Sequence, residues 1–509
     1  MKKLPLSLFV YALLIFTTSC RELLEELSND NLRPPFLKEN PATFQEIGRI
    51  TLGGEGAAEI SAYDPSTQRL FVVSNDEGSR IDVINLQDPT SPTLVEAIDV
   101  TPYGGGVNSV AVNNGLLAAA VEADPAQQPG SVAFFATETL KAVQQVTVGA
   151  LPDMVTFSPD GNYLLSANEG EPSDEYDEDP LGTVSIIEVN NEYVVTTLDF
   201  SAFESQQASL AAEGLRIFGP HASLAEDVEP EFIAISDNSR YAWVSLQENN
   251  GLARIALESK TVDDILPLGF KDYSVAENAI DVSDEDGRIQ LNTWPAFGMY
   301  QPDAIATYRV DGRTYVITAN EGDARDYDGF SEEKRVEDLT LDTSAFPNAE
   351  RLLQEDQLGR LQITTTLGNT DGDEAYEALY SYGARSFSIW DGLTGEQIYD
   401  SGNELEKLII DAGLYDDGRS DAKGVEPEGI TLGKIGHRTI AFVGLERVDA
   451  VVTYDVTDPY HPQFLQVLES GDAPEGLTFV SAKDSPSKKS LFIVSSEDDG
   501  LVKIFQPHL

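Results

Sequence analysis

The chain of 509 residues carries 87 acidic and 33 basic residues, which gives a formal net charge of −54 at pH 7. A surface this acidic repels nucleic acid and anionic lipid, so we expect no nucleic-acid partner. Hydrophobic residues make up 41% of the chain, and the acids are spread along its length, which indicates a folded protein and not an acidic tail.

The N-terminal segment has the features of a bacterial lipoprotein signal. Two lysines precede an apolar run over residues 4–16, and small residues lead to Cys20, the only cysteine. The run is too short to span a bilayer permanently. We therefore expect residues 1–20 to be a signal, Cys20 to carry a lipid and residues 21–40 to form a flexible tether. An ordinary signal peptide with an incidental cysteine is the alternative.

From residue 41 onward, one pattern repeats seven times. A proline or alanine and an acid begin a strand, a tight turn follows, and a second strand ends on glutamate, as in PDMVTFSPDGNYLLSANEG from Pro152. A third strand and usually a fourth complete each unit. Four-stranded units of this kind are typical of a β-propeller, whereas a solenoid needs shorter and more uniform repeats. The units start at Ala58, Val107, Pro152, Pro230, Pro302, Pro427 and Pro474.

The last unit ends after its third strand, and a strand over Phe44–Leu52 precedes the first unit. That strand would supply the missing outer strand and remove exposed edges. We therefore expect an all-β fold over residues 41–509: a seven-bladed β-propeller closed by an N-terminal strand that completes the last blade. Partly helical insertions are expected at about residues 199–227, 262–299 and 322–384, and loops of this length are often functional.

The repeated acids are the candidate functional groups. The first two strands of a unit are antiparallel, so the start of one and the end of the other lie at the same face. We expect these carboxylates to surround the channel mouth and to bind Ca²⁺ or Mg²⁺, the only cofactors expected, because hard cations prefer oxygen ligands. Acids that only cap backbone N–H groups are the alternative. The predicted metal ligands are Asp153, Glu169, Glu231, Glu248, Asp303, Glu321, Glu428 and Glu446.

Two repeats carry an extended signature, SANEGEPSDEY from Ser166 and TANEGDARDY from Thr318. It predicts either a repeated loop structure or a pair of metal-binding loops. Arg325, Arg385 and His221 are predicted ligand contacts, since arginine grips phosphate or carboxylate, although arginines among acids are more often ion-pair partners. No G-x-S-x-G elbow or reactive thiol indicates a nucleophile, so no catalytic residue is assigned.

Several motifs together resemble the choice-of-anchor I family: YQPDAIA, TANEGDARDY, GARSFSIWD, FGPHASLAEDVEPE and APEGLTFV. This family of exported bacterial β-propellers is similar to the mesenchyme-specific cell surface glycoprotein and to YVTN-type repeat proteins. The resemblance covers most of the chain after residue 41. It implies a seven-bladed surface propeller carried by varied anchors, here a lipid. Some members are described as alkaline phosphatase-like or are joined to phosphatase or nucleotidase domains, but the resemblance supplies no catalytic residues.

Together these features predict a lipid-anchored propeller of the cell envelope, on the outer membrane or cell surface of a diderm bacterium. It would bind a cell-surface ligand or protein through its acidic, cation-dependent face, touch the membrane only through its lipid, and act as a monomer. The alternatives are a Ca²⁺-dependent phosphoester hydrolase, with the same carboxylates on the metal and arginines on the phosphate, and a structural surface scaffold.

Overall fold

The computed structural model describes residues 39–76 and 78–508. The expected signal at residues 1–20, the lipidation site Cys20 and residues 21–38 of the expected tether lie outside the described residues. In the described part of the chain, no helix is both long and apolar enough to cross a membrane.

Antiparallel four-stranded sheets make up most of the fold. Within the described residues there are seven of them, and each follows the chain order except the last. Sheet one contains β2 (Ser61–Asp64), β3 (Arg69–Ser74), β4 (Arg80–Asn85) and β5 (Thr93–Asp99). Sheet two contains β6 (Val107–Asn113), β7 (Leu116–Val121), β8 (Pro129–Ala136) and β9 (Ala142–Ala150). Sheet three contains β10 (Pro152–Phe157), β11 (Tyr163–Asn168), β12 (Thr183–Glu188) and β13 (Val194–Leu198).

The other four sheets come from the second half of the chain and the N-terminal strand. Sheet four contains β14 (Pro230–Ile235), β15 (Tyr241–Leu246), β16 (Gly251–Ala256) and β17 (Thr261–Pro267). Sheet five contains β20 (Ile305–Val310), β21 (Arg313–Asn320), β29 (Ser386–Asp391) and β30 (Gln397–Asp400). Sheet six contains β31 (Pro427–Ile435), β32 (Arg438–Leu445), β33 (Ala450–Asp455) and β34 (Gln463–Glu469). Sheet seven contains β35 (Pro474–Val480), β36 (Leu491–Ser496), β37 (Leu501–Pro507) and β1 (Phe44–Thr51).

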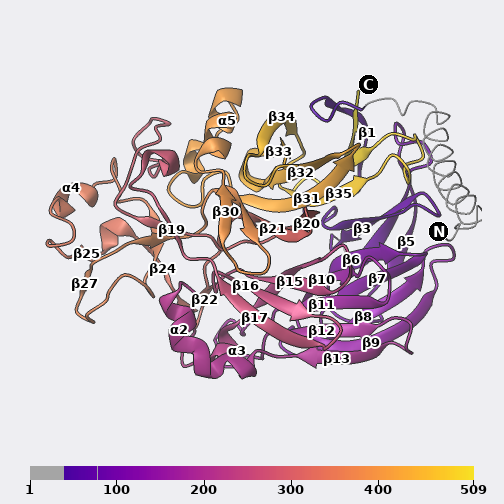
Figure 1. The fold of residues 1–509 in the computed structure, drawn as a ribbon, viewed down its shortest axis with the longest axis horizontal. Helices are drawn as coiled ribbons and strands as arrows, with labels where there is room; N and C mark the ends of the chain where they lie inside the picture. Colours follow the sequence, from indigo (N-terminus) through magenta and orange to yellow (C-terminus); the bar gives the residue numbers. More distant parts are fainter. Residues whose placement is uncertain (1–38, 77, 509) are drawn as a thin grey trace, which may run out of the picture.

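The first strands of the sheets contact one another in order: β2, β6, β10, β14, β20, β31, β35 and again β2. The second and third strands are nearly all buried, because apolar side chains pack against the neighbouring sheet on both faces. In Figure 1 the sheets follow one another around the molecule, from the indigo β3 to the yellow strands beside β1. The result is a propeller-like all-β structure, as the repeat predicts.

Strand β1 pairs antiparallel with β37, from Phe44 opposite Pro507 to Thr51 opposite Leu501. This strand therefore forms the fourth strand of the last sheet. The Phe44 ring is 3% exposed and packs edge-on against Phe442, with ring centroids 5.3 Å apart, and also against Phe492. The backbone N–H and C=O of Phe44 bond the side chain of Gln466 in sheet six. The N-terminal strand thus binds two sheets together.

The structure changes the expected extent of the insertions. The segment before β14 contains η1 (Ser201–Gln206), α2 (Gln207–Ala212) and α3 (Leu224–Asp227). Residues 262–267, expected at the beginning of an insertion, instead belong to the outer strand β17 (Thr261–Pro267), which pairs with β16. Residues 403–424 form an insertion that the sequence did not indicate, with α5 (Glu404–Ala412) and η4 (Asp417–Arg419). Leu405 and Ile409 of α5 are fully buried in the core between sheets five and six.

The two insertions around sheet five form one small unit with its own core. They share a three-stranded sheet of β18 (Phe270–Asp272), β19 (Phe297–Met299) and β28 (Tyr380–Ser381). The amphipathic run near residues 348–358 contains only the short helix α4 (Ala349–Leu352). In Figure 1 this unit projects to the left of the sheets. Its other short elements are η2 (Ala276–Asn278), β22 (Asp326–Tyr327), β23 (Phe330–Ser331), β24 (Glu333–Arg335), η3 (Val336–Asp338), β25 (Thr340–Leu341), β26 (Gln362–Thr364) and β27 (Ala375–Tyr376).

Truncating Phe44 tests how much the N-terminal strand stabilises the fold. We expect Phe44→Ala to lower the free energy of unfolding by about 3–5 kcal/mol, because it leaves a cavity between sheets six and seven. Leu94→Ala, on the outer strand β5 where Leu94 is 49% exposed, should change it by less than about 0.5 kcal/mol. Urea denaturation followed by circular dichroism measures both. Equal effects of the two substitutions would contradict the role given to β1.

Candidate functional site

A β-bulge places the acid at the start of most first strands. The register of β10 with β11 shifts between Pro152 and Met154, so Asp153 is the extra residue. The corresponding shifts in sheets two, four, six and seven fall at Asn108, at Glu231 with Phe232, at Glu428 with Gly429, and at Glu475. A bulge leaves its residue out of the hydrogen-bonded ladder and re-aims its side chain. The repeated acid is therefore turned away from the sheet.

A backbone hydrogen bond joins the glutamate after the second strand to the residue two positions before this acid. The N–H of Glu169 donates to the carbonyl of Leu151, at 2.9 Å, and Glu446 and Glu497 donate in the same way to Glu426 and Ala473. The accepting residues stand just before the proline and have positive φ, between 44° and 54°. Non-glycine residues rarely adopt this conformation, and such strain concentrates at functional sites.

The acids brought together in this way line a central cavity of about 220 Å³. Isolated acids at strand starts would be fully solvated, but here they face one common space. The residues of the wall that are charged are all acidic: Asp153, Glu169, Glu231, Asp303, Glu321, Asp323, Glu428 and Glu475. Ile60, Met154, Phe232 and Ala304 line both this cavity and a less polar one of about 170 Å³. The carboxylates therefore lie against an apolar wall.

Burial and mutual repulsion raise the pKa values of these carboxyl groups. Burial raises the pKa of Asp153 to about 7, and the charges of Glu171 and Glu122 add to it. Burial also raises the pKa of Glu231 well above 4.5, with repulsion from Asp303 as the next cause. The pKa values of Glu169, Asp303, Glu428 and Glu475 shift in the same direction for the same two reasons. Such a site either retains protons near neutral pH or takes up positive charge.

Six of the eight predicted metal ligands line the central cavity: Asp153, Glu169, Glu231, Asp303, Glu321 and Glu428. Glu248 and Glu446 do not line it. After the second strand of sheet four, Gln247 lines the cavity in place of Glu248. The side-chain amide of Gln247 donates to Glu321 at 3.0 Å. Glu446 lies at the edge of the site, beside Glu321 and Glu426. For Glu248 and Glu446, burial raises the pKa to about 7.

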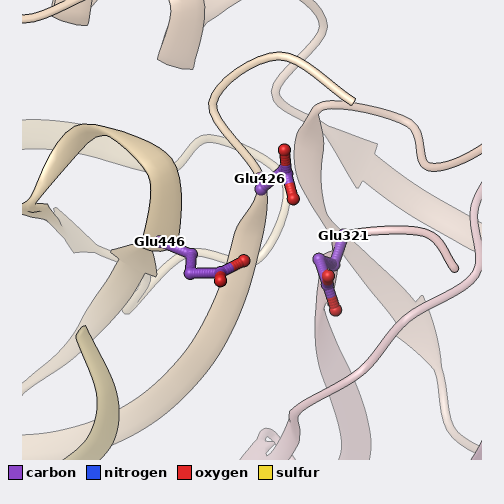
Figure 2. Close-up of side chains that lie close together, drawn as sticks. All are labelled: Glu321, Glu426 and Glu446. Atoms are coloured by element: carbon purple, nitrogen blue, oxygen red, sulfur yellow. The ribbon is translucent and has the colours of Figure 1, made fainter. Parts of the chain in front are cut away.

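Among the described residues, two groups of three acids offer oxygen atoms within 4.8 Å of one another. Asp371, Asp373 and Glu377 form an acidic group in the insertion. Glu321, Glu426 and Glu446 form the other, and Figure 2 shows these three side chains close together. Each stands next to the end of a strand of sheet five or six. The remaining wall acids are spaced more widely than direct chelation requires.

Basic side chains already neutralise part of the Glu321, Glu426 and Glu446 group. The Lys423 ammonium lies 2.9 Å from Glu321, 3.5 Å from Glu426 and 3.7 Å from Asp323. Burial opposes ionisation of Glu426, but Lys423, Arg419 and Arg447 outweigh it and hold its pKa below the ordinary value. Lys423 thus provides an internal cation at one side of the cavity.

Arg325 and Arg385 are structural in this conformation, which does not support their predicted role as ligand contacts. The Arg325 guanidinium donates four hydrogen bonds, to Glu229, to the Tyr176 hydroxyl and to the carboxylate and backbone carbonyl of Asp227. A terminal nitrogen also lies 2.8 Å from Glu229, and the side chain is 2% exposed. The terminal nitrogens of Arg385 donate to Glu406 and to three backbone carbonyls. Their burial could not be read from the sequence, and each guanidinium connects loops beneath the surface.

His221, the third predicted ligand contact, lies on an exposed turn outside the central cavity, with φ of 67°. The turn is held by Asp227, whose carboxylate accepts the N–H groups of Phe218 and Gly219. Asp227 also pairs with Arg325, so the turn that carries His221 is connected to the ion pairs of Arg325 and not to the wall acids.

The two extended signature loops have a clear structural role. Asn168 and Asn320 are fully buried and bond serine or threonine hydroxyls on the third strand of their sheets. The loops also touch each other: the Tyr176 and Tyr327 rings lie 5.7 Å apart, and the Tyr327 hydroxyl donates to Glu171. These contacts favour the repeated loop structure and brace two loops on the acidic face.

Sequence reasoning missed Asp323, Glu426 and Lys423 at this site. A signal existed for Glu426, because the string V-E-P-E occurs twice, at Val228–Glu231 and at Val425–Glu428. In both copies the first glutamate is neutralised by arginine, Glu229 by Arg325 and Glu426 by Arg419. Lys423 belongs to the unexpected insertion after sheet five, so the repeat alone gave no indication of it.

The fold and site define an all-β, propeller-like protein with a carboxylate-lined central cavity. The choice-of-anchor I domain matches residues 59–459, and the chain belongs to the choice-of-anchor I family. The predicted family is therefore confirmed.

Two animal proteins are similar in sequence. Gigasin-3a of Magallana gigas is 31% identical over 182 residues, covering 29% of this chain and 64% of its own length. The mesenchyme-specific cell surface glycoprotein of Strongylocentrotus purpuratus is 26% identical over 321 residues, covering 52% of this chain and 40% of its own length. The chain thus spans less than two thirds of each relative. Hydrazine synthase of Kuenenia stuttgartiensis aligns in structure with a TM-score of 0.48 and 11% identity, over 89% of this chain and 96% of that one.

Replacing one wall acid tests the electrostatic cost of the cavity. Glu231 has a folded-state pKa above 4.5, so its stabilising contribution is complete below pH 4.5 and is lost as pH rises through the folded value. Glu231→Gln removes that loss. In a chelating buffer we expect it to raise Tm by about 1–3 °C at pH 8 and to change little at pH 4.5. Thermal unfolding across this pH range measures the difference.

The control for this experiment is Glu96→Gln, because Glu96 is exposed on the outer strand β5. Its Tm should follow wild type at every pH. A lower Tm for Glu231→Gln at pH 8 would show that the Glu231 carboxylate is already compensated by the protein.

Proposed function

We propose that this protein is a surface β-propeller that binds a ligand or partner through its acidic face with the help of a divalent cation. The observation that carries the proposal is the wall of the central cavity, where eight acidic side chains meet and no basic one is present among its described residues. A buried cluster of one charge sign requires counter-charge or protons. Ca²⁺ or Mg²⁺ fits, because all the charged groups of the wall offer oxygen ligands.

We further infer that the seven sheets form a closed, seven-bladed propeller, and that residues 41–509 act as one domain. The cyclic contact of the first strands, ending with β35 against β2, supports closure. The pairing of β1 with β37 supports it independently, since the two ends of the described chain then share one sheet. Closure matters for function because it gathers acids from separate repeats around one centre.

Unpartnered oxygen atoms support a cation in the cavity. One carboxylate oxygen each of Glu231, Glu428 and Glu475 is buried and has no hydrogen-bond partner among the described residues. A buried polar atom without a partner is costly, so native proteins normally satisfy it through protein, water or an ion. These three glutamates come from sheets four, six and seven, and all stand at β-bulges.

The spacing of the wall acids suggests how a partner could participate. Only Glu321, Glu426 and Glu446 bring oxygens close enough for direct chelation at this site within the described residues. A Ca²⁺ ion takes six to eight oxygen ligands, so a cation held by few carboxylates keeps positions for water or for an oxygen of the partner. Partner affinity would then depend on the cation.

We place the protein outside the cytoplasm, at the cell surface or outer membrane, as a monomer anchored by a lipid on Cys20. One relative is named a cell surface glycoprotein, and the sequence before residue 21 has the lipoprotein pattern. The hydrolase alternative is less favoured, because Arg325 and Arg385, the expected phosphate contacts, are buried and engaged.

A calcium titration tests the cation site. We expect Ca²⁺ to raise Tm at pH 8, since a ligand at 100 times its Kd adds about 2.7 kcal/mol to the unfolding free energy. Affinity should increase from pH 6 to pH 8, because the pKa values of Asp153 and Glu446 are about 7 and their protons compete with the cation. The double substitution Glu231→Gln with Glu428→Gln should reduce the shift, because the wall loses two charges that attract the cation, whereas Glu96→Gln should retain it.

Two results would contradict the proposal: no effect of Ca²⁺ or Mg²⁺ on Tm at any pH, or an equal effect in the double variant. A generic phosphoester assay in parallel separates binding from catalysis. We expect no turnover, while turnover that a chelator abolishes and Ca²⁺ restores would establish the hydrolase alternative.

Removing the internal cation gives a second test. In chelating buffer, Lys423→Met should lower the unfolding free energy by about 1–3 kcal/mol, because Glu321 and Glu426 lose a mostly buried partner. Saturating Ca²⁺ should recover more stability in this variant than in wild type. Lys434→Met, at an exposed position on β31, is the matched control. An unchanged response to Ca²⁺ would place the bound cation away from Lys423.

A further inference from the structure

Another cavity lies on the opposite face of the sheets from the carboxylates. Glu231 stands near the start of β14, and the turn that joins β14 to β15 lies at the other end of that strand. The turn between β20 and β21 has the equivalent position in sheet five. Between these turns and the β29–β30 turn is a groove of about 490 Å³. This arginine groove is lined by Arg240, Arg254, Arg309 and Arg313 together with the aromatic side chains of Tyr241 and Trp243.

The charge of the arginine groove is opposite to that of the chain. Four arginines line it, against the two acids Asp391 and Glu396, in a protein with 87 acidic and 33 basic residues. The net negative charge of the chain attracts cations and basic ligands and repels anions, and the four arginines reverse this preference locally. An anion is the complementary ligand.

Most of these guanidinium groups have donors available. Arg254 is the exception, because Asp263 holds it at 2.7 Å. Arg309 lies 4.0 Å from Asp237 and Arg313 lies 3.9 Å from Asp391, the outer limit for an ion pair, and both arginines are exposed.

Arg240 makes no ion pair within the described residues. One carboxylate oxygen of Asp391 accepts the N–H groups of Leu393 and Thr394 and so holds the β29–β30 turn. The long contact with Arg313 involves the other oxygen. Three arginines can therefore turn toward a bound anion without breaking a short ion pair.

Apolar surface accompanies the positive charge. Tyr241 is 40% exposed and Leu393 is 70% exposed, so both present apolar surface at the groove. The Trp243 indole lies beneath them and is fixed by a hydrogen bond from its Nε1 to the carbonyl of Gly392, at 2.8 Å. The groove thus has a rigid aromatic floor between flexible arginines.

We propose that the arginine groove binds a small organic anion with one carboxylate or phosphate group and a flat apolar portion. Its volume lies in the range of small-molecule sites, and such sites combine apolar walls with a few directed polar groups. Arg240 and Arg313 hold the anionic group through paired N–H donors, which match carboxylate and phosphate geometry. The apolar portion packs against Tyr241 and Leu393.

Isothermal titration calorimetry with matched probes tests this proposal. The probes are phenyl phosphate, benzoate, inorganic phosphate and the neutral benzyl alcohol. We expect phenyl phosphate or benzoate to bind saturably, inorganic phosphate to bind more weakly, and benzyl alcohol not to bind. Comparing phenyl phosphate with benzoate distinguishes a phosphate site from a carboxylate site. Added salt should weaken binding of the anions.

Variants locate the site. Arg240→Gln with Arg313→Gln should weaken binding of the aromatic anion by about tenfold or more. Arg351→Gln, at an exposed position on α4, should leave it unchanged, and all three substitutions should preserve Tm because their side chains are exposed. Tyr241→Ala should weaken the aromatic probe more than inorganic phosphate. The proposal is overturned if neither aromatic anion binds at millimolar concentration, or if the double variant binds as wild type does.

Discussion

A backbone hydrogen bond between the start of the first strand and the end of the second organises the central site. Where Glu169, Glu446 and Glu497 donate to the residue before the proline, that residue is held at positive φ and the following acid is displaced into a β-bulge. One local arrangement therefore orients two acids per unit. Because the first strands of the sheets contact one another in a cycle, the same arrangement gathers acids from distant parts of the chain.

The cost of this gathering is electrostatic, and the protein offsets only part of it. Lys423, Arg419 and Arg447 neutralise Glu426 and its neighbours at sheets five and six, and Arg325 neutralises Asp227 and Glu229 outside the wall. The wall acids of the other sheets have no such partner among the residues that line the cavity. The uncompensated part of the ring is where a cation or protons would stabilise the fold most.

Much of this site could be predicted from the repeat, because a period in sequence becomes a repeated position in space. Six of eight predicted ligands line the cavity, and Phe44–Leu52 includes β1. Glu248 does not line the cavity, because β15 ends at Leu246 and Gln247 takes the wall position. The ion pairs of Arg325 and Arg385 could not be predicted, because burial and partners are properties of the folded chain, and an arginine beside acids looks the same in sequence whether it is free or engaged.

The sequence by itself determined the all-β class, the family, and the face on which the acids lie, since strand direction follows from alternating strands and turns. Only the tertiary structure decided which acids remain unpaired, because Lys423 and Arg419 come from an insertion after sheet five and approach through space. The arginine groove was likewise beyond the repeat. Its charges belong to turns of two neighbouring sheets, and their proximity exists only after those sheets pack together.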